Sequence, residues 1–332
     1  MNSSDPINLD SRLHSCGGAN TPSVSVIIPS FNRGDLIERA VRSVLDQDYP
    51  NLQIIVADDG STDGTRERLS EAVGIEYYWQ ENSGPSAARH LGLRPARGQY
   101  VAMLDADDFW NPGYLRSAVE QLDLGRVDFT FSNWEIAGPG ATPEYASQLH
   151  RLPYVAELKG DRWGVWTELS TEDTRNLFIR HSPAPSSGMV IRRDLVSHGW
   201  NEALRIGEDW LLVLGAILKH RARGAFTFEK GWTKWIDDRN ICDCNTEFSW
   251  RAGQEVISQA LILETYGNWL TPAEREAIKA KMAATYFDWG YHESRSGVRS
   301  KAVRYFMQSF AKQPALKPVA GLLKAMIRRT RI

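Results

Sequence analysis

Cysteine is scarce in this chain of 332 residues. The three cysteines are Cys16, Cys242 and Cys244, and no two of them form a C-x-x-C pair. They cannot all pair with one another, and no second Cys or His pair at ligand spacing accompanies Cys242 and Cys244. The sequence therefore predicts spectator thiols in a reducing compartment, with neither a disulfide framework nor a zinc site.

Long hydrophobic runs are missing as well. The longest apolar run, 211–218, is far shorter than the ~20 residues that a membrane-spanning helix needs. Residues 1–22 are polar and contain no apolar core of a signal peptide. We therefore expect a cytoplasmic protein that contacts the inner face of a membrane peripherally, if at all.

The chain also has no excess of positive charge, although its charge is unevenly distributed. The formal net charge is −2, but residues 295–332 hold ten Lys or Arg and no acid, which leaves 29 bases against 41 acids elsewhere, a charge of −12. An acidic body argues against a nucleic-acid-binding protein. The basic end suits anionic lipid or an acidic partner. Within it, residues 319–329 form an amphipathic basic helix that fits either a membrane surface or packing against the protein.

The first third of the chain alternates short apolar runs with helical periodicity. The strands are expected at 24–28, 52–57, 75–79 and 100–104, and the helices at 35–47, 65–73 and 85–93. This alternation predicts an open, mostly parallel, Rossmann-like α/β sheet with right-handed crossovers. Ligands of such sheets bind beyond the carboxyl ends of the strands. The polar clusters at 29–33, 58–64 and 105–108 all fall there.

The pattern changes twice in the remainder. We expect helices at 112–122 and 209–219 and strands at 128–132 and 188–192. Between them lies a weakly patterned region, 138–185, which we expect to be a variable loop that shapes an acceptor pocket. Long helices follow at 247–266, 272–289 and 297–311. The predicted domains are a polar extension (1–22), a sheet domain (23–240) and an all-helical C-terminal module (241–332).

The motif Asp105-Ala106-Asp107 follows the last predicted parallel strand, and Asp108 adds a third carboxylate. Such a cluster repels itself unless a cation, a hydrogen-bonding ligand or open water compensates. An extended backbone places Asp105 and Asp107 on the same side. Hard oxygen donors at a sheet edge suit Mg²⁺ or Mn²⁺, which complete their shells with substrate phosphates. A solvated acidic turn is the alternative for this motif on its own.

Other polar clusters accompany this motif. They are Pro29-Ser30-Phe31-Asn32-Arg33, Asp58-Asp59-Gly60-Ser61-Thr62-Asp63-Gly64, Asn82-Ser83-Gly84-Pro85-Ser86-Ala87-Ala88-Arg89 and, further downstream, Gly207-Glu208-Asp209-Trp210. In this order and spacing they resemble the family 2 inverting glycosyltransferases of the GT-A fold, over about residues 24–240. The resemblance implies a hexosyltransferase-type enzyme, a nucleotide-sugar donor (a UDP-sugar above all), and Mn²⁺ or Mg²⁺ as cofactor. Its acceptor would be a carbohydrate, a lipid-linked saccharide or a protein, in polysaccharide, glycolipid or other glycoconjugate synthesis.

The resemblance also assigns roles to residues of the donor site. The expected nucleotide-binding residues are Pro29, Phe31, Asn32, Arg33, Asp58, Asp59, Ser61, Asn82, Gly84, Arg89, Asp105 and Ala106. Among them Phe31 would border the base, Asp59 would accept its N–H, and Asp105 would contact the ribose. Asp107 would bind the metal. Turn formation is the alternative for Asp58 and Asp59, and it is the favoured role of Asp63.

Sugar transfer needs an acceptor hydroxyl that loses its proton as it attacks, and a positioned carboxylate can take that proton. Asp209 occupies the family's base position at the start of a predicted helix, and Glu208 would orient the acceptor. The implied reaction is a single in-line displacement with inversion. The alternative is an acidic first turn that merely stabilises the helix dipole.

Two positions depart from the family pattern. His90 stands where many members have Asn, and the stretch 235–240 lacks a His that many carry near the metal or diphosphate, so Arg239 or Asp238 would have to substitute. Two alternatives remain open: a catalytically silent nucleotide-sugar-binding protein, and a nucleotidyltransferase, although no Gly-rich basic phosphate loop follows the first strand. No G-x-G-x-x-G follows a strand, which excludes a NAD-dependent oxidoreductase.

Overall fold

The computed structural model describes residues 23–70, 72, 74–141, 149, 152–156, 158, 160–240, 248–314 and 318–322. The strands are β1 (Val24–Ser30), β2 (Leu52–Asp58), β3 (Ile75–Trp79), β4 (Tyr100–Met103), β5 (Phe109–Trp110), β6 (Phe129–Ala137), β7 (Asp161–Trp163), β8 (Trp166–Glu168), β9 (Met189–Arg192) and β10 (Gly224–Trp235). The helices are α1 (Ile37–Leu45), α2 (Thr65–Leu69), α3 (Pro85–Leu93), α4 (Tyr114–Asp123), α5 (Pro153–Ala156), α6 (Thr171–Arg180), α7 (Glu208–His220), α8 (Phe248–Tyr266), α9 (Pro272–Arg295) and α10 (Arg299–Lys312).

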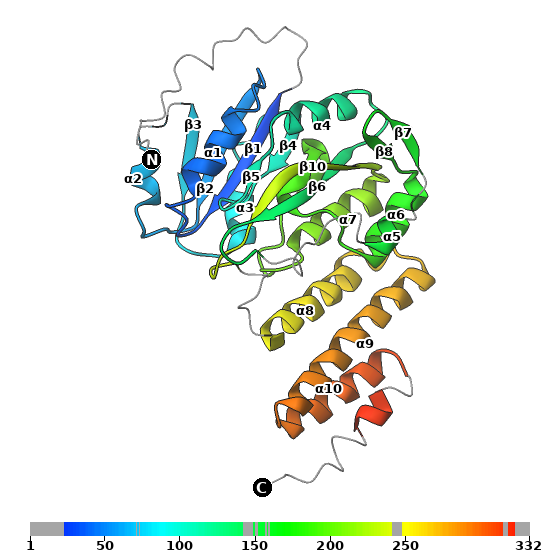
Figure 1. Cartoon of the computed structure of the whole chain (residues 1–332). Coiled ribbons are helices and arrows are strands. Elements are labelled where there is room, and N and C mark those ends of the chain that lie inside the picture. The colour runs from blue at the N-terminus through cyan, green and yellow to red at the C-terminus, as the bar shows by residue number, and fades with distance from the viewer. Residues whose placement is uncertain are drawn as a thin grey trace.

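A single mixed sheet forms the centre of the molecule (Figure 1). Its strand order is β3-β2-β1-β4-β9-β6-β10-β8-β7, with β5 paired to β10. The first four strands are parallel, and their apolar side chains are buried on both faces, as the uninterrupted run Val26-Ile27-Ile28 illustrates. The predicted parallel α/β sheet is confirmed.

The order of these strands also places the helices. The chain moves from β1 outward to β3 and then returns to β4 on the other side of β1. Right-handed crossovers therefore place α1 and α2 on one face of the sheet and α3 on the other. All four parallel strands end at the same edge, so the segments after β1, β2 and β4 lie side by side there.

Two antiparallel pairings bring later parts of the chain to this edge. Strand β9 runs antiparallel to β4 with Ala102 opposite Val190, so the turn that precedes β9 lies beside the residues that follow β4. Strand β5 pairs with the end of β10, Trp110 opposite Trp232. This pairing places the segment after β10 next to Asp107 and Asp108.

The prediction for residues 138–185 is wrong in its second half. Strands β7 and β8 form a hairpin that extends the sheet beyond β10, and α6 follows, capped by Ser170, whose Oγ accepts the Asp173 N–H at 3.0 Å. Three-residue strands are too short to show an alternating pattern in the sequence. They form here because β8 pairs with the edge of β10 and β7 pairs with β8.

The three predicted C-terminal helices are confirmed as α8, α9 and α10, and α9 runs six residues further than expected, to Arg295. They lie together below the sheet in the view of Figure 1, with α10 beside α9. Ile262 and Ile278 join the main hydrophobic core, and the Tyr266 hydroxyl donates to the Leu211 carbonyl at 3.1 Å. Helices α8 and α9 therefore share a core with the sheet, whereas Ala302 and Phe306 of α10 form a separate cluster, and the predicted division at 240 stays a prediction.

Several expectations concern residues outside the described part of the chain. They are the polar extension 1–22, the three cysteines, and residues 323–329 of the amphipathic helix. Residues 318–322 are helical, as expected. Among the described residues no helix is long and apolar enough to cross a bilayer.

Candidate active site

Arg89 links two of the predicted functional carboxylates. Its guanidinium lies 2.7 Å from Asp105 Oδ1 through one nitrogen and 2.7 Å from Glu208 Oε1 through the other. Arg89 is only 5% exposed, and the pair with Glu208 joins residues 119 positions apart. Burial opposes the charge of Arg89, but Asp105, Asp209 and Glu208 outweigh it and raise its pKa. The sheet edge and the start of α7 therefore meet at one buried arginine.

The two acids at the start of α7 have different surroundings. Burial, reinforced by the charge of Asp209, raises the pKa of Glu208 to about 7. Asp209 is half-buried, and its two carboxylate oxygens accept hydrogen bonds from the Trp200 indole N–H (2.9 Å) and the Ser186 hydroxyl. Neither acid is a freely solvated residue of a surface helix.

Asp107 faces a different group of partners from Asp105. Its Oδ2 lies 3.0 Å from the Arg33 guanidinium and 3.2 Å from Asn240 Nδ2. Burial raises the pKa of Asp107 to about 6, against the opposing charge of Arg33. Asn240 therefore contacts Asp107, while Arg239, one of the two residues expected to replace the missing His, pairs instead with Asp35 at 2.8 Å.

Asp108 is buried, and both its carboxylate oxygens are engaged. Oδ2 accepts from the Ser187 hydroxyl at 2.6 Å and Oδ1 from the Trp235 N–H at 3.0 Å. Burial and the charges of Asp107 and Asp105 raise its pKa well above the usual value. Ser187 also accepts the Asp105 N–H at 3.1 Å. Asp108 and Ser187 thus fix the backbone that presents Asp105 and Asp107.

The predicted base-binding residue Asp59 holds a turn of the chain. One of its oxygens accepts from Gln80 Nε2 (2.7 Å) and the Ser83 N–H (2.9 Å), and the other accepts from the Gly84 N–H (2.7 Å). Asp59 is 2% exposed. It shapes the loop that leads into α3 and so positions Arg89 at the first turns of that helix.

The neighbouring residues form the wall beside this loop. Asp58 accepts from the Ser61 N–H at 2.7 Å and from the Tyr77 hydroxyl, and the Ser61 hydroxyl accepts the Asn32 N–H at 2.9 Å. Phe31, just after β1, is 48% exposed. Its ring is free to border a flat ligand, and the hydrogen-bonded segments around it are fixed.

The remaining expected residues lie in the same region. Pro29 belongs to β1, Asn82 is exposed in the loop shaped by Asp59, Gly84 precedes α3, and Ala106 is buried between Asp105 and Asp107. Asp63 accepts from the Gly34 N–H at 2.8 Å and the Thr65 hydroxyl at 2.6 Å, as its turn role predicts. The fold therefore gathers the expected residues at one edge of the sheet.

The family model described as glycosyl transferase family 2 matches residues 25–200, more than half of the chain. The chain belongs to this family. The prediction of a glycosyltransferase is confirmed, which sets aside the nucleotidyltransferase and the catalytically silent binding protein.

Relatives of this family 2 glycosyltransferase come from several bacteria. It is 32% identical over 224 residues to a Bacillus subtilis (strain 168) protein named for teichuronic acid biosynthesis, TuaG, covering 64% of this chain and 86% of that protein. It is 34% identical over 139 residues to the Escherichia coli UDP-Glc:alpha-D-GlcNAc-diphosphoundecaprenol beta-1,3-glucosyltransferase WfaP, covering 41% of this chain and 55% of WfaP. The chain therefore spans nearly all of TuaG and about half of WfaP.

Solved structures share its fold. S. aureus TarS 1-349 in complex with UDP-GlcNAc superposes with a TM-score of 0.61 at 18% identity, covering 91% of this chain and 90% of that one. The mannosyltransferase PcManGT from Pyrobaculum calidifontis, in complex with GDP-Man and Mn²⁺, gives a TM-score of 0.55 at 19% identity, covering 93% and 80%. The predicted GT-A fold is confirmed.

The carboxylates of this glycosyltransferase suit a metal ion whose coordination shell is completed by the substrate. Among the described residues no group of three or more His, Cys, Asp or Glu side chains is arranged as a metal shell. Asp105 and Asp107 keep 39% and 14% of their side chains exposed, whereas Asp108 is buried and engaged. One or two chain carboxylates plus phosphates and water is the way Mg²⁺ is commonly bound beside a nucleotide. The residues present fit such an ion.

Sequence reasoning missed Ser186, Ser187, Trp200 and Asn240. Each contacts a predicted functional carboxylate, but each lies far from it in the sequence or carries no charge. Trp200 lies in the run Gly199-Trp200-Asn201-Glu202, which resembles the family's approach to its acidic pair, and Asn240 ends the stretch 235–240, but neither pattern assigns the residue a contact. Serine directly before a predicted strand, as at Ser186-Ser187, is too common to single out.

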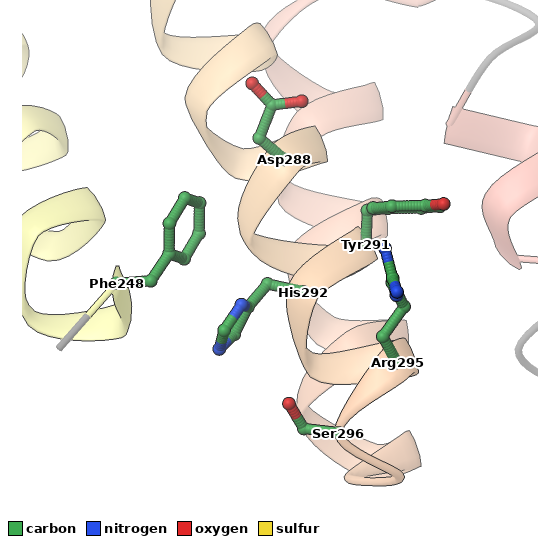
Figure 2. Close-up of a pocket in the computed structure, with 6 residues that line it drawn as sticks. All are labelled: Phe248, Asp288, Tyr291, His292, Arg295 and Ser296. Carbon is green, nitrogen blue, oxygen red and sulfur yellow. The ribbon is translucent and has the colours of Figure 1, made fainter. Parts of the chain in front are cut away.

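A separate hollow of about 540 Å³ lies between α8 and α9 (Figure 2). Its lining residues are Phe248, Asp288, Tyr291, His292, Arg295 and Ser296. The Phe248 and His292 rings are stacked, with their centroids 4.6 Å apart. None of the lining residues belongs to the sheet edge, so the hollow is distinct from the carboxylate site.

Proposed function

We propose that this glycosyltransferase moves a sugar from a UDP-sugar to the hydroxyl of a saccharide acceptor, with inversion, at the edge of the sheet beyond β1, β2 and β4. The observation that carries the proposal is the buried bridge Asp105–Arg89–Glu208, with both contacts at 2.7 Å. It joins the carboxylates assigned to the donor with the acidic pair assigned to the acceptor.

On the donor side, the proposed base-binding wall is formed by the exposed ring of Phe31 and the loop that Asp59 holds. Asp105, whose side chain is 39% exposed, is the proposed ribose contact. Arg33 and Arg89 are two of the cations next to the carboxylates, and a diphosphate is an anion that both would attract. UDP is proposed as the carrier because WfaP is named for UDP-Glc and a TarS structure holds UDP-GlcNAc.

Asp107 is the proposed metal ligand, with Asp105 next to it. A bound Mn²⁺ or Mg²⁺ would neutralise negative charge on the leaving diphosphate. Its own charge would also offset the burial and the carboxylate repulsion that raise the pKa values of Asp107 and Asp108. The complex of PcManGT with GDP-Man and Mn²⁺ supports Mn²⁺ as the first ion to test.

On the acceptor side, Asp209 is the proposed general base and Glu208 orients the acceptor. Asp209 takes the proton of the acceptor hydroxyl while that oxygen forms a bond to the anomeric carbon. The bond from the anomeric carbon to the diphosphate oxygen breaks on the opposite face, and the electron pair leaves with the UDP. Attack from the face opposite the leaving group inverts the anomeric centre.

A lipid-linked saccharide is the proposed acceptor, because WfaP is named for transfer to a diphosphoundecaprenol-linked sugar. The proposed division of labour gives residues 23–240 to catalysis and the basic end of the helical module 241–332 to contact with the membrane. The cytoplasmic location stays a prediction.

The proposed function predicts slow hydrolysis of a UDP-sugar when no acceptor is present. We expect a thermal-shift screen of UDP-, GDP- and TDP-sugars to single out UDP-sugars, and only when Mn²⁺ is added. Release of UDP should then require Mn²⁺ and stop on chelation with EDTA. Equal turnover with and without EDTA would contradict the metal assignment, and stabilisation by GDP-sugars alone would contradict the choice of UDP.

The pH dependence of donor binding provides a further check on Asp107. A metal binds the ionised carboxylate, so a pKa of about 6 predicts that Mn²⁺-dependent donor affinity rises as the pH rises through about 6 and is weak below it. Asp107→Asn should abolish this response. Asp46→Asn, an acid outside the site on the residue after α1, should leave it unchanged.

The basic C-terminal end predicts contact with anionic membranes. Wild-type protein should co-sediment with vesicles that contain anionic lipid, and less with neutral vesicles or at high salt. A truncation before Pro318 should lose most of this binding. Equal sedimentation of the two proteins would remove the membrane role and favour packing of this segment against the protein.

A further inference from the structure

We propose that Trp200 and Ser186 are positioning residues that hold the carboxylate of Asp209 ionised and correctly oriented as the base. This inference rests on the proposed function, in which Asp209 accepts the proton of the acceptor. Neither residue belongs to the acidic pair, and neither is expected to touch the donor. Both act through Asp209.

The contacts define a clamp on the two oxygens of one carboxylate. The Trp200 indole N–H donates to Asp209 Oδ1 at 2.9 Å, and the Ser186 hydroxyl donates to Oδ2. The donors come from two different segments, since Ser186 lies in the turn before β9 and Trp200 in the segment between β9 and α7. A carboxylate gripped at both oxygens cannot rotate about its terminal bond.

The local backbone makes the Trp200 donor rigid. The side chain is 3% exposed, and the preceding Gly199 has a φ of +70°, a conformation that favours glycine. A Cβ at Gly199 would lie 2.5 Å from His90 Nδ1. The chain therefore passes tightly over α3 immediately before Trp200, and this close approach fixes where the indole points. The Ser186 hydroxyl, by contrast, turns about a single bond and can yield its place when the acceptor hydroxyl arrives.

Hydrogen bonds to a charged acceptor are stronger than bonds to its neutral form, so both donors favour the ionised carboxylate. The charged groups that face Asp209 are Glu208 on the same helix, Arg89 on α3 and, through Arg89, Asp105 after β4. The indole N–H adds a hydrogen bond to the carboxylate without adding a charge that the acceptor would have to avoid.

The test is the pH profile of UDP release from the UDP-sugar selected by the thermal-shift screen, measured with Mn²⁺ and saturating donor. Trp200→Phe keeps a buried ring and removes the N–H. We expect the acidic limb of the profile of kcat against pH to move up by about one pH unit. The reason is that the free energy of a hydrogen bond to a charged group is about that of one pKa unit. We expect kcat at pH 7 to fall about tenfold, with the donor KM unchanged.

A matched control is available at the next tryptophan of the same region. Trp210 is also buried, and its indole N–H donates to the Phe178 carbonyl, away from the carboxylates. Trp210→Phe should leave the acidic limb where it is, whatever it does to stability. Ser186→Ala, which removes the second donor with almost no change in volume, should move the limb in the same direction as Trp200→Phe and provides the test if that variant does not fold.

An acidic limb at the same pH in Trp200→Phe, Ser186→Ala and Trp210→Phe would overturn the proposal. A donor KM that rises while the limb stays fixed would do the same, because it would assign both residues to donor binding. Failure of the underlying function gives a different result: Asp209→Asn would retain turnover in the same assay, and the clamp would then hold a carboxylate that is not the base.

Discussion

Replacing Asp209 by Asn is expected to abolish sugar transfer and to leave donor binding intact. The amide has nearly the shape of the carboxylate, so the clamp can persist in part, but it cannot take a proton from the acceptor. Loss of a general base costs about 10²–10⁴ in rate. The measurements are turnover with Mn²⁺ and donor affinity by calorimetry. Turnover should therefore fall at least about 100-fold further than donor affinity. The reason is that Asp209 contacts no predicted donor residue other than through Arg89.

An acidic residue in the first turn of another helix is the matched control. Asp173 lies in the first turn of α6 as Asp209 lies in the first turn of α7. If Asp209 only stabilised the helix dipole, Asp173→Asn and Asp209→Asn would each cost about 0.3–1 kcal/mol of stability and neither would affect turnover. Loss of donor binding in proportion to turnover in Asp209→Asn would end the assignment of Asp209 as the base.

Replacing Arg89 by Met is expected to destabilise the protein by about 3 kcal/mol and to remove activity. The substitution leaves Glu208, which is buried, without its cation, and breaking a buried pair costs about 3–5 kcal/mol. We take the lower end because the other partner, Asp105, is 39% exposed and can be solvated. Denaturant unfolding gives the free energy of unfolding, and turnover gives the loss of activity.

The pH dependence of this destabilisation has a definite sign. Burial raises the pKa of Glu208 to about 7 in the folded protein, above the usual value of 4.5 for this side chain. The folded state therefore holds the Glu208 proton more tightly than the unfolded state, and this contribution to stability is present at low pH and lost as the pH rises through about 7. Arg89 opposes that shift. Arg89→Met should therefore lower the free energy of unfolding more at pH 8 than at pH 5.

A partly exposed ion pair provides the comparison for Arg89→Met. Arg175 pairs with Glu274 at 2.5 Å, but its side chain is 26% exposed. Arg175→Met should therefore cost only about 1 kcal/mol, with turnover preserved. Equal destabilisation by the two substitutions would show that the Arg89 bridge contributes no more to stability than this partly exposed pair, whose side chains are 26% and 14% exposed.

Much of the donor half of the site could be predicted from the sequence. Strands β1, β2 and β4 are short apolar runs whose pattern is local, and the polar residues that follow them must lie at one edge if the strands are parallel. The positions of Asp59, Asp105 and Asp107 at that edge follow from this argument alone. The acidic pair Glu208-Asp209 was placed by resemblance, since nothing local distinguishes it from any other acidic first turn.

The sheet beyond β4 was harder to predict. Strands β7 and β8 have three residues each, which is too few for an alternating pattern. They are stabilised by pairing with β10, far away in the sequence. The contact between Asn240 and Asp107 could not be predicted from the sequence for the same reason. It depends on the pairing of β5 with β10, two strands far apart in the sequence.

The sequence by itself determined that Asp105 and Asp107 follow a parallel strand at the edge where ligands of such sheets bind, because residue type and spacing are local properties that the chain carries before it folds. Only the tertiary structure decided what each carboxylate contacts. Arg89 bridges Asp105 and Glu208, and Trp200 and Ser186 grip Asp209. These partners depend on the antiparallel register of β9 against β4 and on the packing of α7, and contacts of that kind leave no periodic trace in the sequence.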